Sequence, residues 1–232
     1  MSIVYETKIA EAIKILQELV REKALKVTLA FSHQNEDAIN IALAQKAGID
    51  FDVFTLETHK LFNESIAYEK EIEAFFGIEI KRFSASNEQI KALEAKVGEY
   101  GIFDDIHLRK ECCHVRKLIP LAHALKGYDG WISGIRIAQS ITRSDTKLVE
   151  FDEKFELLKF NPLTHFSDEE VERYMRESAI PSNALYAKGF KSIGCKPCTR
   201  AIKEGEDIRA GRWWWENPEH KECGLHLHKE NV

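Results

Sequence analysis

Short apolar segments alternate with amphipathic segments along the first half of the chain, and this alternation limits the possible fold more than any other feature. Three segments have the length and composition of buried strands: KVTLAF (26–31), FDVFTL (51–56) and IEIKRF (78–83). Helical periodicity fills the stretches before and after them, at 6–23, 35–48 and 64–77. Strand–helix alternation at this spacing predicts an α/β protein with a mostly parallel sheet and helices on both of its faces.

The second half continues the pattern and then loses it. We expect a helix around 111–125, a strand at 129–134, and a hairpin-like addition near the sheet edge from 147–151 and 154–160. Ser167 and Glu170 have the spacing of a capping box, which predicts a helix over 167–178. Beyond Ile180, Gly and Pro punctuate the chain, so we expect loops with one short helix near 198–204. We divide the chain into a main domain, 1–203, and a mobile C-terminal tail, 204–232.

Composition limits the cellular setting and the class of partner. The 232 residues carry a formal net charge of −5, which argues against a general nucleic-acid binder. The N-terminus lacks the pattern of a secretory signal, and no apolar run is long enough to cross a bilayer. We therefore expect a soluble cytoplasmic protein without nucleic-acid or membrane partners. In a reducing compartment, its five cysteines are metal ligands or catalysts rather than disulfides.

Four of the five cysteines form two close pairs. Cys112 and Cys113 are adjacent, and Cys195 and Cys198 form a C-x-x-C motif. This arrangement is typical of a tetrathiolate site, which holds either structural zinc or an iron–sulfur cluster. Adjacent cysteines are unusual around a single zinc ion, whereas separate iron corners of a cubane can each bind one of them, which favours a 4Fe–4S cluster. Four unconnected buried thiols are the remaining alternative.

Basic residues gather around both pairs, although the chain as a whole is acidic. They are Arg109, Lys110, Arg116 and Lys117 near the first pair, and Lys196, Arg200, Arg209 and Arg212 near the second. Such cations can stabilise an anionic cluster, and they can also bind an anionic substrate. For Lys110 and Lys196 a simple solvent-facing position is the favoured interpretation.

Two further segments run from a strand into a loop. LAFSHQNEDA (29–38) leads into a helix start that favours a phosphate, but it lacks the glycines of a dinucleotide or Walker loop. SGIRIAQSITR (133–143) contains Gln139, Ser140 and Arg143. At the carboxyl edge of a parallel sheet these loops form either a nucleotide cleft or ordinary connections.

Five motifs, taken together and in order, resemble one enzyme family. They are CCHVRKLIPL, WISGIRIAQSITR, SIGCKPCTR, RAGRWWWE and ECGLH (222–226). They look like the assimilatory sulfonucleotide reductases, and within these the iron–sulfur branch that acts on adenosine 5′-phosphosulfate. The resemblance covers about residues 27–228. It implies an adenine-nucleotide α-hydrolase-like (PP-loop-like) fold and a thioredoxin-dependent cleavage that gives sulfite and AMP.

The resemblance also implies roles for individual residues. Cys112, Cys113, Cys195 and Cys198 match the ligands of a 4Fe–4S cluster, and Cys223 matches the nucleophile. The match to phosphosulfate-binding residues covers Lys117, Arg209, Arg212 and His226, with Arg143 and Arg136 as further candidates near the nucleotide. Ser32 and the loop 33–37 match the adenosine side. Thioredoxin or glutaredoxin is the implied electron donor, and we also expect a homo-oligomer.

The implied chemistry agrees with the residue types. A thiolate attacks the sulfur of the phosphosulfate, and a second thiol then releases sulfite from the S-sulfocysteine. Cys223 must therefore meet first a bound substrate and then a partner protein, which suits a hinged tail. Trp213, Trp214 and Trp215 either anchor that tail or simply pack in the core.

Two positions depart from the family pattern, and three alternatives remain. His33 stands where an aromatic or small residue is usual, and His59 stands where the family has glycine. Both bear on nucleotide contacts, so a reductase of the 3′-phosphorylated nucleotide, or one that accepts both nucleotides, is the first alternative. An ATP-pyrophosphatase-type enzyme of the same fold would need a glycine-rich loop that SHQNEDA lacks. A non-catalytic iron–sulfur sensor would have no use for Cys223.

Overall fold

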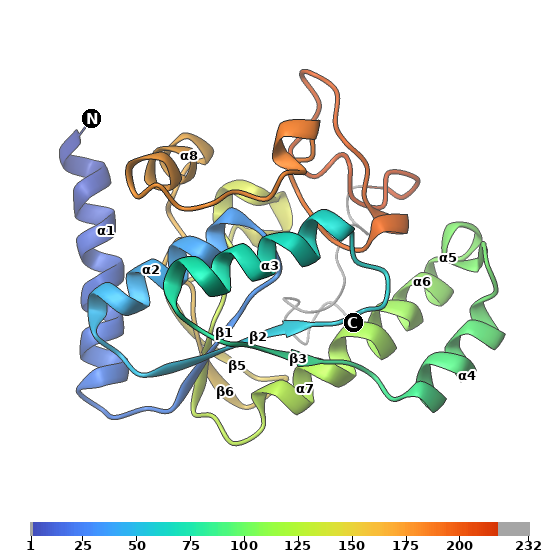
Figure 1. Cartoon of the computed structure of the whole chain (residues 1–232), viewed down its shortest axis with the longest axis horizontal. Helices are drawn as coiled ribbons and strands as arrows, with labels where there is room; N and C mark the ends of the chain where they lie inside the picture. The colour runs from blue at the N-terminus through green and yellow to red at the C-terminus, as the bar shows by residue number, and fades with distance from the viewer. Residues whose placement is uncertain (1, 218–232) are drawn as a thin grey trace.

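The protein is built on one six-stranded sheet. The computed structural model describes residues 2–217, in which the strand order is β3-β2-β1-β4-β6-β5 (Figure 1). The strands are β1 (Val27–Ala30), β2 (Phe51–Leu56), β3 (Ile80–Phe83), β4 (Gly130–Ile132), β5 (Val149–Asp152) and β6 (Leu157–Phe160). All neighbouring strands pair in parallel except β5, which pairs antiparallel with β6 at the sheet edge. The predicted mostly parallel sheet and its edge hairpin are both confirmed.

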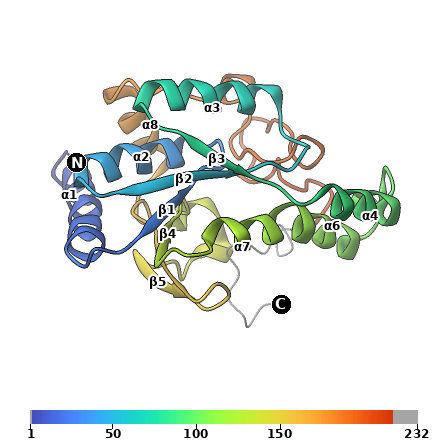
Figure 2. The ribbon, with the colours of Figure 1, turned by 60° about the horizontal axis from the view of Figure 1, so that its bottom comes forward.

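Helices cover both faces of this sheet, as the alternation predicts. The α-helices are α1 (Ser2–Leu16), α2 (Asn35–Ala47), α3 (Asn63–Phe76), α4 (Asn87–Val97), α5 (Gly101–Asp104), α6 (Ile106–Cys113), α7 (Ile119–Leu125) and α8 (Asp168–Glu177). Two π-helical turns, η1 (Gln17–Arg21) and η2 (His114–Leu118), follow α1 and α6. Figure 2 shows α2, α3 and α8 on one side of the sheet and α7 on the other. None of the helices within 2–217 has the length and apolar character needed to cross a membrane.

The main core lies between the sheet and α2. Leu29 of β1 and Ile132 of β4 are fully buried there, against Ile39 of α2 and Phe160 of β6. Helix α2 is buried along nearly its whole length because α1 and α8 cover it from outside. On the opposite face, a smaller core joins Trp131 and other apolar residues of the strands to α7.

Two sequence expectations need correction. The helix expected near 198–204 is wrong: a 3₁₀ turn, Lys196–Cys198, ends there, and Thr199 instead forms a β-bridge with Arg212. The helix expected at 111–125 exists, but it consists of α6, η2 and α7 in succession. Pro120, in the first turn of α7, cannot donate a backbone hydrogen bond to the preceding turn, which accounts for the change to π geometry there.

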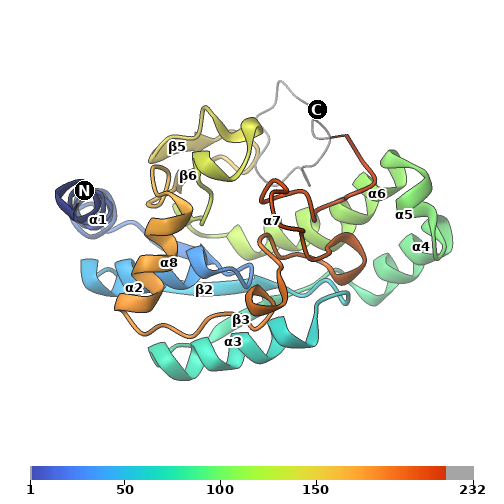
Figure 3. The same ribbon diagram turned by 90° about the horizontal axis from the view of Figure 1, so that it is seen from above.

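The C-terminal part of the described chain packs against this framework. In Figure 3 the segment coloured orange to red lies between α8 and α6. Arg209, Arg212 and Trp213 within it are buried. The boundary at 203/204 and the mobile tail expected at 204–232 stay predictions; of that tail, the structure describes only 204–217, and 218–232 lie outside the described residues.

Replacing Leu29 by Ala tests the main core. Leu29→Ala removes a fully buried side chain from the central strand, so we expect the free energy of unfolding to fall by about 2–5 kcal/mol. Val4→Ala, at a position that is 60% exposed on α1, is the control and should change it little. Urea unfolding followed by circular dichroism measures both, and equal losses would contradict this account of the core.

Candidate functional site

A cavity opens at the carboxyl ends of the central strands. In the sheet, β2 lies on one side of β1, whereas β4 and then β6 lie on the other side. The direction in which successive strands are added therefore reverses between β1 and β4. In open α/β sheets ligands bind at such a point. The cavity there, which we call the sheet-end cavity, has a volume of about 140 Å³. Its walls come from the segments that follow β1, β2 and β4 and from the loop residues 193–213.

The loop after β1 is held by one buried carboxylate. Asp37 Oδ2 accepts hydrogen bonds from the backbone and hydroxyl of Ser32, both at 2.7 Å, and from Gln34 N at 3.3 Å. Gly134, after β4, allows this close packing, because a Cβ there would lie 2.6 Å from Asp37 Oδ1. Burial raises the pKa of Asp37 to about 7, even though the hydrogen bonds from Ser32 act in the opposite direction.

Both histidines that depart from the family pattern adopt left-handed backbone conformations. His33 has φ +68° and His59 has φ +56°, in the region that glycine adopts most easily. Glycine would adopt the backbone conformation found at His59 without strain. His33 is buried, lines the sheet-end cavity, and its Nε2 lies 3.2 Å from Glu69 Oε2.

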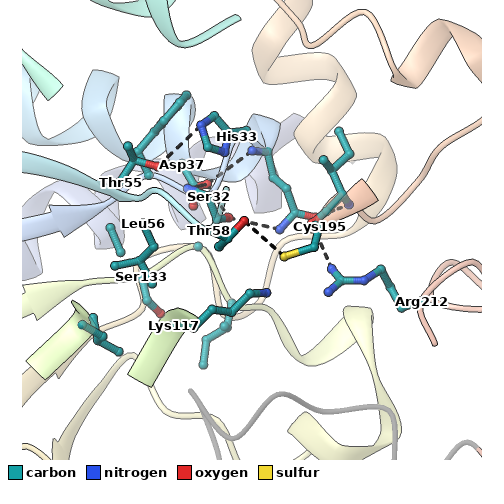
Figure 4. A pocket seen from close by; sticks show the side chains of 18 of the residues that line it. Ser32, His33, Asp37, Thr55, Leu56, Thr58, Lys117, Ser133, Cys195 and Arg212 are labelled. Carbon is teal, nitrogen blue, oxygen red and sulfur yellow. Dashed lines mark hydrogen bonds between the residues drawn. The ribbon is translucent and has the colours of Figure 1, made fainter. Parts of the chain in front are cut away.

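Cationic side chains from distant segments converge on the same cavity. Lys117, Arg143, Arg209 and Arg212 all line it. Arg212 lies directly against Gly194, where a Cβ would come within 2.5 Å of its guanidinium carbon. Its Nη1 donates to the Ile193 carbonyl at 2.9 Å, whereas its buried Nε has no hydrogen-bond partner within 2–217. In Figure 4, Lys117 and Arg212 approach Cys195 from different elements. The arrangement suits an anion.

The two cysteine pairs line a second, adjoining cavity. It has a volume of about 160 Å³, and we call it the cysteine cavity. Cys112 and Cys113 reach it from the end of α6, and Cys195 and Cys198 from the loop and turn at 195–198. The residues shared by both cavities are Lys117, Cys195, Arg212 and Trp213. Residues that would contact a group bound by the cysteines therefore also face the sheet-end cavity.

The surroundings of the cysteines fit an anionic sulfur-rich group. Burial raises the pKa of the Cys198 thiol to about 11 and also raises the pKa of Cys112, so binding as thiolates needs a strong positive partner. Cys195 Sγ lies 3.4 Å from Thr58 Oγ1, and Trp213 has a buried indole N–H without a hydrogen-bond partner in the described chain. Cluster sulfur is an acceptor for such donors.

The four cysteines that line the cysteine cavity are the right number for a tetrathiolate site. Structural zinc takes four ligands at the corners of one small tetrahedron, whereas a four-iron cluster binds each thiolate at a separate iron.

The described end of the chain is fixed beside the cysteine cavity by a buried ion pair. Glu216 accepts hydrogen bonds from Arg109 Nε at 2.8 Å and from Nη2 at 2.6 Å. The Arg109 guanidinium also lies 4.7 Å from the ring of Trp213, and that of Arg212 lies 4.5 Å from the same ring. Desolvation opposes the charge of Arg109, but hydrogen bonds to Glu216 and Cys113 nevertheless raise its pKa. Trp213 thus packs in the interior, whereas Trp214 is exposed.

The structure brings most, though not all, of the expected site residues together. Those that line one or both cavities are Ser32, Lys117, Arg143, Arg209, Arg212 and the four paired cysteines. Arg136 lies elsewhere: it is buried in ion pairs with Glu36 and Asp168 and links α2 to α8. Cys223 and His226 lie outside the described residues.

Sequence reasoning gave no individual role to Asp37, Thr58, Arg109 or Glu216. Asp37 lies in the first turn of α2, where an acidic side chain can accept hydrogen bonds from the preceding loop. This sequence signal could have indicated its role. Nothing local in the sequence indicates that Glu216 meets Arg109, because 107 residues separate them.

Comparison with known proteins agrees with this geometry. Residues 26–201 match the family model described as the phosphoadenosine phosphosulfate reductase domain. The chain belongs to this family. A member from Agrobacterium fabrum (strain C58), named adenosine 5′-phosphosulfate reductase, is 48% identical over 83% of this chain and 74% of its own length. A member of the same name from Allochromatium vinosum is 40% identical over 95% of this chain and 86% of its own length.

Solved structures with low identity confirm the fold. Phosphoadenylyl-sulfate reductase from Candida auris has a TM-score of 0.64 at 20% identity, covering 84% of this chain and 96% of its own. NMN synthetase from Francisella tularensis has a TM-score of 0.57 at 13% identity, covering 78% and 73%. The expected adenine-nucleotide α-hydrolase-like fold is therefore confirmed.

The raised pKa of Asp37 gives a prediction about pH. The folded chain favours the protonated carboxyl, so this group's contribution to the free energy of unfolding falls as the pH rises from 3.8, its ordinary pKa, to the raised pKa of about 7. Asp37→Asn stays neutral and keeps an oxygen that can accept from Ser32. The stability of the wild type relative to Asp37→Asn should therefore decrease by a few kcal/mol between ~pH 4 and ~pH 8.

Urea midpoints measured across this pH range provide the test. Asp145→Asn, at an exposed position, is the matched control for the exchange of an aspartate for an asparagine. A pH-independent difference between the wild type and Asp37→Asn would contradict the raised pKa of Asp37.

Proposed function

We propose that this protein reduces adenosine 5′-phosphosulfate to sulfite and AMP in sulfate assimilation. The observation that carries the proposal is the shared wall of the two cavities, where Lys117 and Arg212 face both the nucleotide-type cleft and the four cysteines. The relatives named adenosine 5′-phosphosulfate reductase, at 37–48% identity, support this substrate.

The four paired cysteines would hold a 4Fe–4S cluster. Their common cavity and the buried cations beside them fit this group. The adjacent pair Cys112 and Cys113 suits separate iron corners better than a single zinc ion. When bound, the cluster supplies a fixed, buried anionic centre against which the neighbouring cations are held. We assign it no electron transfer, because the thiols provide both electrons.

The cationic residues counter the charge of the reacting groups. Lys117, Arg209 and Arg212 would bind the phosphosulfate and so reduce its repulsion of the incoming Cys223 thiolate. His226 would also bind the phosphosulfate. Ser32 and the loop that Asp37 fixes would face the adenosine, with Arg143 nearby. Arg136, which is already fully engaged with Glu36 and Asp168, would act by holding the fold.

The reaction would proceed in two thiol steps. Cys223 Sγ forms a bond to the sulfonate sulfur, the bond from that sulfur to the phosphate oxygen breaks, and AMP leaves with the electron pair. One thiolate of thioredoxin, or of glutaredoxin, then attacks Cys223 Sγ in the S-sulfocysteine, and sulfite leaves with the bonding electrons. The donor's second thiol resolves the mixed disulfide, so the donor becomes oxidised and Cys223 returns to a thiol.

The 3′-phosphorylated nucleotide is the second candidate substrate. The family model carries its name, and His33 lines the sheet-end cavity. We further expect a cytoplasmic homo-oligomer. Sulfite release measured with each nucleotide in the presence of thioredoxin decides between the two substrates.

Loss of Cys223 tests the mechanism. Cys223→Ser should lower sulfite release by at least a thousandfold, because a hydroxyl cannot form the S-sulfo intermediate or undergo thiol exchange. Mass spectrometry of the wild type, mixed with adenosine 5′-phosphosulfate but no donor, should show one sulfonate on Cys223. Wild-type rates in Cys223→Ser would refute the mechanism.

Anaerobic purification tests the cysteine site. The wild type should be brown, with about four iron and four sulfide per chain, and Cys195→Ser should lose most of both. Cys198→Ala should behave similarly, whereas Ser144→Ala at an exposed position should retain both. A colourless protein that contains zinc would contradict the cluster.

A further inference from the structure

The pair formed by Arg109 and Glu216 is not explained by substrate binding or by cysteine ligation. Neither residue lines the sheet-end cavity. Yet the side chains are 0% and 7% exposed, and both guanidinium contacts to the carboxylate are short. A buried bidentate ion pair fixes the relative orientation of its two side chains as well as their distance. The pair is therefore suited to hold the two segments that carry it in one orientation.

The pair connects the end of the described chain to the helix that carries the first cysteine pair. Arg109 lies one helical turn before Cys113 on α6 and hydrogen bonds to that cysteine. Glu216 stands seven residues before Cys223. The backbone N–H of Trp213 donates to the Cys198 carbonyl at 3.1 Å, and Glu216 N donates to the Trp213 carbonyl at 2.8 Å, which closes a turn. Trp215, inside this turn, packs against Phe103 with the ring centroids 4.5 Å apart.

We propose that Glu216, held by Arg109, is a positioning residue for Cys223. The inference rests on the proposed function and adds to it a residue that sets where, and in which direction, the segment bearing the nucleophile leaves the protein. Sulfur transfer needs the thiolate in line with the bond that breaks, and a small misplacement is costly. The Arg109–Glu216 pair fixes the origin of that segment next to the cysteine cavity.

Tether length alone cannot provide a strong effect, and this makes the proposal testable. Without the pair, the nearest residue held by another contact would be Trp215, whose ring lies 4.5 Å from that of Phe103. The sequence separation from Cys223 would then grow only from seven to eight residues. Effective concentration falls with about the −3/2 power of tether length, which gives a loss of less than about twofold. A larger loss of rate in a variant without the pair would show that the pair also orients the segment that bears Cys223.

The experiment compares Glu216→Gln with Glu206→Gln. Glu206 also forms a bidentate pair, with Arg200 at 2.8 and 3.0 Å, but it is partly exposed and lies outside both cavities. The rate of S-sulfocysteine formation is measured in a single turnover with adenosine 5′-phosphosulfate and no donor. We expect at least a fivefold slower step in Glu216→Gln, and wild-type rates in Glu206→Gln. AMP affinity, iron content and the visible spectrum should be unchanged in both.

Three results would overturn the proposal. A rate within twofold of the wild type would show that the pair does not direct the segment. Loss of iron in Glu216→Gln would show that the pair maintains the cysteine site instead. Weaker AMP binding would place Glu216 in the nucleotide cleft. Should Glu216→Gln fold poorly, Glu216→Asp, which keeps the charge but shortens the reach, is expected to slow the same step.

Hydrogen exchange separates this proposal from the proposed function. Peptides covering residues 213–217 should exchange faster in Glu216→Gln than in the wild type or Glu206→Gln, whatever reaction the protein catalyses. If the wild type formed no S-sulfocysteine, the proposed function would fail, and the exchange data alone would decide whether the pair anchors the segment. Unchanged exchange would overturn the anchoring.

Discussion

Buried positive charge beside buried cysteines is the constraint on which the rest of this structure depends. Arg109, Arg116, Arg209 and Arg212 are all at most 9% exposed, and burying a guanidinium is unfavourable unless anions or acceptors surround it. Carboxylates supply part of the balance through Glu216 and Glu94. Under the proposed function, thiolates bound in a cluster would supply the rest, and the cations and the cysteines would then stabilise one another.

Local backbone features bring these charges into one wall. The π-helical turn η2 directly follows Cys113 and carries Arg116 and Lys117, so cysteines and cations leave one helix within two turns. Gly194 lets the Arg212 side chain lie against the loop that bears the second cysteine pair. A side chain at Gly194 would displace Arg212 from both cavities at once. The sheet itself contributes the other wall, at the place where its strand order reverses.

Much of the fold follows from the sequence, because its signals are local. Strand length, helical periodicity and the Ser167 capping box each act within one element, and the predicted sheet, edge hairpin and α8 are confirmed. The expected helix near 198–204 failed because Thr199 pairs with Arg212 instead, and tertiary pairing of this kind leaves no local pattern. The segment 87–104 received no expectation at all, although Ser86 caps α4 through a capping box with Gln89.

The residues of the candidate site likewise fall into those that the sequence could predict and those that depend on tertiary contacts. Residue types and spacing, together with family resemblance, identified the cysteines and the cations, because four cysteines form two close pairs and basic residues gather around both pairs. They could not identify which cation binds what: Arg136 proves to be a link between α2 and α8, while Arg109 meets a carboxylate 107 residues away. Ion pairs between distant segments form only when the chain has folded. The Arg109–Glu216 pair is such a contact. It fixes the last described residues of the chain beside a site whose first cysteine pair comes from the middle of the sequence.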